Sequence, residues 1–135
     1  MKFRSRKAQG EWVEQLFVLV VMALGLKVLR PLCESAYDVV IENPATGTMK
    51  RVQVKSVSVA EESGAYAINS GFGRDCKKPY TAKQTDLIAA YVIPEKTWYL
   101  IPVEEIRRLK RLRVRPHHPK NSGFERFRET WQLVF

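Results

Sequence analysis

The sequence has few cysteines and no long apolar segment, and these two shortages exclude several classes of protein. Two cysteines among 135 residues, Cys33 and Cys76, are too few for a disulfide framework and too far apart for a zinc knuckle. The apolar run over residues 16–26 is shorter than the roughly 20 residues that a membrane-spanning helix needs. We therefore expect reduced thiols and a cytoplasmic protein.

The N-terminus leaves a second interpretation open. Four cations precede the apolar run, and Ala23 and Gly25 have the spacing of a signal-peptidase site. Glu11 and Glu14 interrupt that pattern, and an amphipathic helix over residues 11–24 explains the same residues. We favour the helix, with an exported or membrane-surface basic protein as the alternative.

Acidic residues are also scarce. The chain has 23 Lys and Arg against 14 Asp and Glu, a formal net charge of +9 that favours a polyanionic partner, with nucleic acid as the first candidate. Residues 107–128 contain nine Lys or Arg and one acid, Glu125. This segment is typical of a phosphate-binding surface, although a solvated basic face has the same composition.

Length and composition predict one folded domain over residues 1–135. A hydrophobic content of 45% is sufficient for a core. Periodicity and turn signals predict a mixed α/β chain. Strands are expected over residues 27–32, 37–42, 50–57, 65–69, 87–93 and 97–101, and helices over residues 11–24, 81–84, 103–109 and 124–133.

The two strands over residues 37–42 and 50–57 are expected to form an antiparallel hairpin that carries a polar cluster. A turn centred between residues 45 and 46 places Asp38 opposite Gln53, and the two-residue period of a strand puts Gln53 and Lys55 on one face. A carboxylate, an amide oxygen and an ammonium would then be sufficient for a divalent metal ion and a nucleophilic water. The alternative is a polar face that simply points to water.

The ordered set of motifs resembles the PD-(D/E)XK nuclease superfamily, in particular a small bacterial branch with a QxK motif. The resemblance covers the chain from about residue 7 to the C-terminus. It is carried by residues 7–14, Ala36-Tyr37-Asp38, Arg51 to Ser56, Tyr80 to Tyr91, and Trp98 to Pro102.

The resemblance implies a restriction-endonuclease-like α/β core with a mixed sheet of about four or more strands flanked by helices. It implies an endonuclease that uses Mg²⁺ or Mn²⁺ to hydrolyse phosphodiester bonds, with DNA as the expected substrate and a homodimer as an option. The matching catalytic positions are Glu14, Asp38, Gln53 and Lys55, and the metal ligands would be Glu14, Asp38, Gln53 and the Val54 carbonyl.

Two positions depart from the motif. Tyr37 stands where the family has proline, and Gln53 supplies a neutral oxygen where it has a second acid. The amide keeps a second function open, a nucleic-acid-binding module that has lost cleavage. We also expect nearby carboxylates to favour the charged form of Lys55.

Basic residues outside the hairpin are expected to hold the phosphate backbone. These are Arg74, Lys77, Lys78, Arg111, Arg113 and Arg115. The sequence shows no set of base-reading residues, so low or structure-based specificity is expected. Asp86 is expected to brace a buried strand, whereas Trp98, Tyr99 and Trp131 are expected in the core. We assign no chemistry to His117 and His118.

Overall fold

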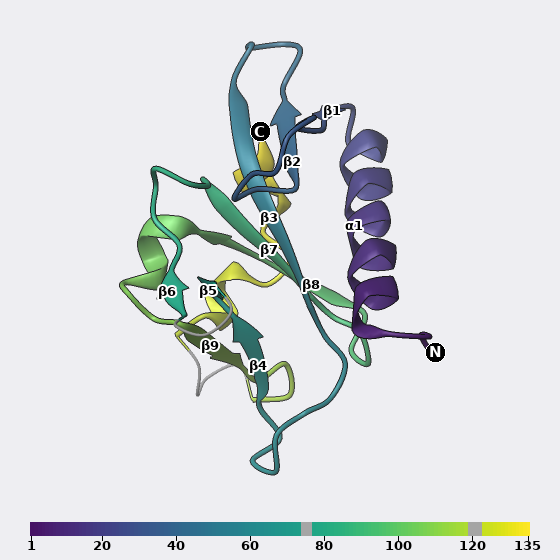
Figure 1. Ribbon diagram of the computed structural model, residues 1–135, viewed down its shortest axis with the longest axis vertical. Coiled ribbons are helices and arrows are strands. Elements are labelled where there is room, and N and C mark those ends of the chain that lie inside the picture. Colours follow the sequence, from purple (N-terminus) through teal and green to yellow (C-terminus); the bar gives the residue numbers. More distant parts are fainter. Residues whose placement is uncertain (74–76, 119–122) are drawn as a thin grey trace.

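The computed structural model describes residues 1–73, 77–118 and 123–135. A five-stranded mixed sheet in the order β1-β2-β3-β7-β8 packs against one long helix, α1 (Figure 1). The sheet contains β1 (Lys27–Leu29), β2 (Val39–Glu42), β3 (Met49–Val57), β7 (Leu87–Val92) and β8 (Thr97–Pro102), and α1 spans Arg6–Ala23. The predicted mixed α/β class is confirmed.

Most of the smaller elements lie on the face of the sheet away from α1, whereas the last 3₁₀ segment packs on the α1 side, where Trp131 contacts Phe17 (Figure 1). Two short antiparallel pairs join β4 to β9 and β5 to β6, and short 3₁₀ segments follow β8 and β9. Their bounds are β4 Tyr66–Asn69, β5 Gly71–Phe72, β6 Lys78–Pro79, β9 Arg111–Val114, η1 Val103–Ile106, η3 Glu125–Phe127 and η4 Trp131–Val134.

The hairpin of β2 and β3 forms in the predicted register. Val39 pairs with Val52, and Glu42 pairs with Met49. The turn closes with hydrogen bonds from the Asn43 N–H to the Thr48 carbonyl (2.9 Å) and from the Gly47 N–H to the Asn43 carbonyl (2.7 Å). Gly47 has a φ of 74°, a conformation that glycine adopts without steric cost.

The sheet separates two hydrophobic clusters. On one face, Val13, Phe17 and Val21 of α1 pack with Val52 and Val54 of β3. On the other, the side chains of β4 and β9 pack with alternate residues of β7 and β8. All six residues of β7 are buried because both faces of this central strand are covered, as its continuous apolar sequence predicted.

The first helix begins earlier than predicted. It starts at Arg6 because the Ser5 hydroxyl accepts a hydrogen bond from the Ala8 N–H (3.1 Å) and caps the helix. Within the described ranges, no helix is both long and apolar enough to cross a bilayer.

The other three predicted helices are wrong. Residues 81–84 form a turn in which the Gln84 side chain accepts from Thr81, and 103–109 contributes only the 3₁₀ segment η1. Residues 124–133 break into η3 and η4 around Glu129, which has a φ of 54°. The Glu129 carboxylate accepts hydrogen bonds from the Thr97 hydroxyl (3.0 Å) and the Trp98 N–H (2.6 Å), so tertiary contacts override helical periodicity here.

Asp86 braces the start of two central strands, as expected. Its carboxylate accepts hydrogen bonds from the Arg51 backbone N–H (2.7 Å) and from the Arg51 guanidinium (3.0 and 3.1 Å). The Arg51 side chain lowers the pKa of Asp86 through these hydrogen bonds. Trp98 and Tyr99 are buried, and Trp131 packs against the same core, so all three expected core aromatics are confirmed.

We predict that Asp86→Ala lowers the free energy of unfolding by about 1–2 kcal/mol, because the Arg51 N–H loses its acceptor. A carboxylate whose pKa is lowered on folding stabilises the protein above its ordinary value of 3.8, and this contribution is lost as pH falls through the folded-state pKa. The stability of the variant should therefore decrease less than that of the wild type on acidification. Urea unfolding at several pH values measures both effects, with the exposed Glu62→Ala as control, and equal stability of Asp86→Ala and wild type would contradict the bracing role.

Candidate active site

The site forms where β3 continues beyond the start of β2. Even-numbered residues of β3 direct their backbone groups toward β2, as the hydrogen bond from the Asp38 N–H to the Val52 carbonyl shows (2.9 Å). β2 begins at Val39, so its ladder does not reach Val54. The Asp38 carboxylate fills this place, and its Oδ2 accepts a hydrogen bond from the Val54 N–H (2.7 Å).

Gln53 lies beside the same carboxylate oxygen. Its Nε2 donates to Asp38 Oδ2 (2.8 Å) and approaches the Val54 carbonyl at 3.3 Å. Both hydrogen bonds to Asp38 use Oδ2, so Oδ1 accepts none from the described side chains or backbone. The predicted pairing of Asp38 with Gln53 is therefore seen as a direct contact.

Glu14 approaches the hairpin from α1. Its carboxylate forms an ion pair with the Arg30 guanidinium, which follows β1. The charge of Glu14 raises the pKa of Asp38, so the helix places a second acid within electrostatic reach of the hairpin.

The Asp38 carboxyl has a raised pKa. The largest cause is burial, which disfavours the charged form, and the charge of Glu14 acts in the same direction. The Val54 N–H, Lys55 and Arg30 oppose this shift without reversing it. A nearby cation would stabilise the charged form of this buried carboxylate, which a second acid disfavours.

Lys55 lies on the same face of the hairpin, next to Tyr80. Its Nζ is 3.5 Å from the Tyr80 hydroxyl and 5.3 Å from the ring centroid. The expectation that carboxylates favour its charged form is wrong as a net effect. Burial lowers the pKa of Lys55, and Asp38 only partly compensates, while Lys77 adds repulsion.

The donor set at this place suits a hard divalent cation. Asp38, Glu14, the Gln53 amide and the Val54 carbonyl offer only oxygen to a metal ion, as Mg²⁺ and Mn²⁺ prefer. The described residues contain no group of three His, Cys, Asp or Glu that would form an all-side-chain metal site. Two carboxylates completed by neutral oxygens and a phosphate therefore fit an ion that keeps part of its water shell.

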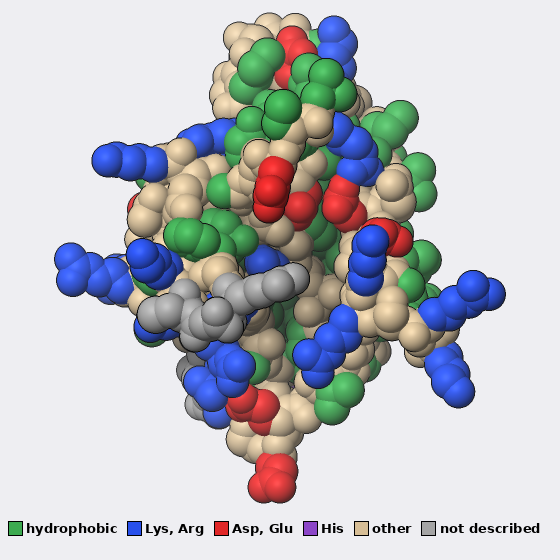
Figure 2. Space-filling view, viewed as in Figure 1, with side chains coloured by type: hydrophobic (Ala, Val, Ile, Leu, Met, Phe, Trp, Pro, Cys, Tyr) green, Lys and Arg blue, Asp and Glu red, His purple; other side chains and the backbone are tan. Residues whose placement is uncertain are grey.

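A groove of about 510 Å³ lies between α1 and β4 and includes Val54 and Lys55 in its lining. Its walls include Arg6 and Gln9 from α1, Lys55 and Ser56 from β3, and Ala67 and Asn69 from β4. Gln9 holds α1 to this part of β3 through a hydrogen bond to the Ser56 hydroxyl (3.0 Å). Figure 2 shows acidic side chains gathered in the middle of this face, over the space between the sheet and α1, with Lys and Arg around them.

The predicted phosphate-binding residues surround the groove only in part. Lys77 acts on the pKa of Lys55, so it is near the site, and Lys78 is exposed on β6. Arg111 and Arg113 are exposed on β9, directly across from the groove-lining residues of β4. Arg115 follows β9 and is half-buried, and Arg74 lies outside the described residues.

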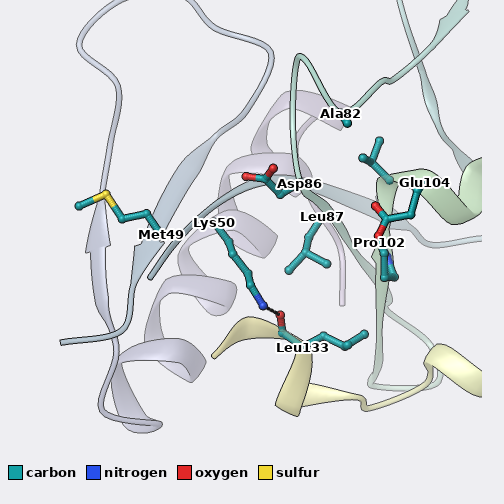
Figure 3. A pocket seen from close by; sticks show the side chains of 9 residues that line it. Met49, Lys50, Ala82, Asp86, Leu87, Pro102, Glu104 and Leu133 are labelled. Atoms are coloured by element: carbon teal, nitrogen blue, oxygen red, sulfur yellow. Dashed lines mark hydrogen bonds between the residues drawn. The ribbon is translucent and has the colours of Figure 1, made fainter. Parts of the chain in front are cut away.

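A second pocket, of about 370 Å³, lies at the other end of β3 (Figure 3). Two of its polar side chains are engaged with the protein, and a third, Glu104, is exposed on its wall. The Lys50 ammonium donates to the Leu133 carbonyl (2.6 Å), and Asp86 is held by Arg51. His117 likewise pairs with Glu95 at 2.6 Å, far along the chain from the hairpin. Neither the second pocket nor the His117–Glu95 pair is therefore a better candidate for the active site than the cluster around Asp38.

Three residues at the site were missed from the sequence. Arg30 pairs with Glu14, Gln9 fixes α1 against β3, and Tyr80 covers Lys55. Arg30 belongs to no motif and carried no signal, whereas Gln9 lies within the first motif, which did not reveal its contact with Ser56. Tyr80 begins the fourth motif of the resemblance, so its position marked it although its contact with Lys55 did not follow.

Comparisons with known proteins agree with this geometry. A family model described as PD-(D/E)XK endonuclease matches residues 4–134. Among solved structures, the chain is similar to a bacterial homing endonuclease, I-Ssp6803I, at 26% identity and a TM-score of 0.82, over 96% of this chain and 93% of that chain. No curated protein matches the chain. The expected superfamily and restriction-endonuclease-like fold are confirmed.

We predict that Glu14→Gln lowers the pKa of Asp38, because it removes a negative charge that raises this pKa. Carbon-detected NMR titration of the Asp38 carboxyl measures the effect without metal. Glu11→Gln, an exposed position on the same helix, is the matched control and should leave the titration unchanged. An Asp38 titration that is insensitive to Glu14→Gln would mean that the two acids are electrostatically independent.

Proposed function

The chain belongs to the PD-(D/E)XK endonuclease family, and we propose on this premise that it hydrolyses DNA phosphodiester bonds with Mg²⁺ or Mn²⁺ at the Asp38 cluster. The observation that carries the proposal is the convergence of Asp38, Gln53 and Val54 at the open edge of β3, with Glu14 and Lys55 in electrostatic contact with Asp38.

The proposed ligands are Asp38, the Gln53 amide oxygen and the Val54 carbonyl, with Glu14 as a ligand or as the acceptor for a water. When bound, the ion supplies an activated water and charge neutralisation at the phosphate. The Val54 carbonyl lies on the side that β2 leaves open, so the backbone of β3 would hold part of the site in place.

Gln53 has to change its role to become a ligand. In the structure its Nε2 donates to Asp38 Oδ2, and this orientation turns a donor toward the carboxylate. Rotation of the amide by half a turn brings Oε1 to the same place at the cost of that hydrogen bond. The neutral amide contributes no charge, so we expect affinity for the ion to depend on Asp38 and Glu14.

Lys55 is proposed to contact the scissile phosphate. Its ammonium lies on the same face as Asp38 and Gln53, and the Tyr80 hydroxyl at 3.5 Å restricts its position. Burial lowers its pKa, which means that the charged form is poorly solvated and gains from an anionic partner. A phosphate oxygen is such a partner, and Lys55 would donate hydrogen bonds to it.

The cations around the groove are proposed to hold the DNA backbone. Arg6 lines the groove, and Lys77, Lys78 and Arg111 are exposed. Each phosphate contact releases counterions and makes affinity strongly salt-dependent. We extend the proposal to one domain over residues 1–135 that acts in the cytoplasm. We also propose a homodimer, because one active site cuts one strand and two sites are needed to cut both strands of a duplex.

We predict that the wild-type chain nicks supercoiled plasmid with Mg²⁺ or Mn²⁺ and that Lys55→Ala and Asp38→Asn lower the rate by about 100-fold or more. Lys27→Ala, at an exposed lysine on the edge strand β1, should retain the wild-type rate. Gel assays with EDTA controls measure this. Equal nicking by Lys55→Ala and wild type would remove the enzymatic assignment, and DNA binding without cleavage by the wild type would support the inactive binding module instead.

We predict that Gln53→Glu binds Mn²⁺ about tenfold more tightly than wild type, because a carboxylate adds charge to the ligand set. Calorimetry without DNA measures this independently of turnover. Gln132→Glu, at an exposed position of η4, is the control for added negative charge. Unchanged affinity in Gln53→Glu would show that residue 53 does not contact the ion.

A further inference from the structure

The β4–β9 ribbon has one buried and one exposed face. Tyr66 and Ile68 of β4 and Leu112 and Val114 of β9 point into the core. The alternate residues form the outer face, where Ala67 pairs with Arg113 and Asn69 pairs with Arg111. A two-stranded ribbon therefore presents small, amide and guanidinium side chains outward in two cross-strand pairs.

This outer face is continuous with the candidate active site. Ala67 and Asn69 line the same groove as Lys55, so the β4 half of the face forms its wall. Arg111 and Arg113 stand directly opposite these two residues on β9. A duplex whose backbone reaches Lys55 would meet the ribbon alongside.

A two-stranded ribbon with these outward side chains suits the major groove of B-form DNA. That groove, about 12 Å wide, admits a two-stranded β-ribbon, whereas the major groove of A-form RNA is deep and narrow. Arginine contacts guanine through O6 and N7, and asparagine contacts adenine through N6 and N7. The Asn69–Arg111 pair places both types of base-contacting side chain at adjacent positions.

The residues of this outer face differ in the hydrogen bonds that they already make within the protein. Asn69 is oriented by the Gly71 N–H, which donates to its Oδ1 (3.0 Å), and its Nδ2 donates no hydrogen bond to the described residues. The Arg113 Nε donates to Glu61 (2.9 Å) at the far end of the ribbon, so part of that guanidinium is already engaged. Arg111 is exposed on the same face.

We propose that the β4–β9 ribbon enters the major groove of duplex DNA and that Asn69 and Arg111 select bases beside the cut. The inference rests on the proposed function for the position of the duplex, and it assigns sequence preference to two residues far apart in the chain. That separation explains why the sequence showed no base-reading set.

Selection from a randomised DNA duplex, followed by sequencing of the bound fraction, tests the inference. The wild type should enrich particular bases, and Arg111→Lys should reduce the preference for guanine at one position by about tenfold, because lysine keeps the charge but loses the two-pronged donor. Asn69→Ala should relax a different position. Lys77→Ala, at an exposed cation near the site, should weaken binding to all sequences evenly.

An Arg111→Lys variant that keeps the wild-type base preference would overturn the inference. So would a wild-type protein that selects no bases, that does not bind duplex DNA, or that prefers duplex RNA. Thermal melting by circular dichroism confirms that each variant is folded. Binding and cleavage are scored separately on the same pool. Base selection without cleavage would reject the proposed function and retain this inference, whereas indiscriminate cleavage would do the reverse.

Discussion

The candidate site depends on the hydrogen bond between the Val54 N–H and the Asp38 carboxylate. β3 is nine residues long and β2 is four, so the ladder between them stops before β3 does. An unpaired N–H at a buried edge is costly, and the Asp38 side chain satisfies it in place of a strand. The same contact fixes a carboxylate beside the Val54 carbonyl and Gln53, within electrostatic reach of Glu14 and Lys55.

Asp38 and Lys55 are both held where burial disfavours the charged form of the side chain. Burial raises the pKa of Asp38 and lowers that of Lys55, and the attraction between them compensates only in part. Charged groups kept poorly solvated are typical of functional sites. The packing of the sheet offsets the free-energy cost of burying these charges. β7 is buried along its whole length, and α1 packs Val13, Phe17 and Val21 against β3. A cation and a phosphate would relieve both shifts.

The hairpin and its register could be predicted because a strand period of two and a turn at Gly47 determine which residues face each other. Asp38, Gln53 and Lys55 were found for that reason, and the ordered motifs identified the family. The helices after residue 80 could not be predicted, because side chains such as Glu129 bond to distant backbone groups and break a helical pattern. Arg30, Gln9 and the net pKa shift of Lys55 depend on tertiary packing, which no local pattern contains.

The most direct test of the central claim is paramagnetic broadening by Mn²⁺ in ¹⁵N-labelled protein. We predict that substoichiometric Mn²⁺ broadens the amide signals around Asp38, Gln53 and Val54 first, together with those near Glu14 on α1, and that Asp38→Asn abolishes the effect. Broadening centred on His117 and His118, or confined to the hairpin without α1, would contradict the convergence of oxygen donors from separate elements on one ion.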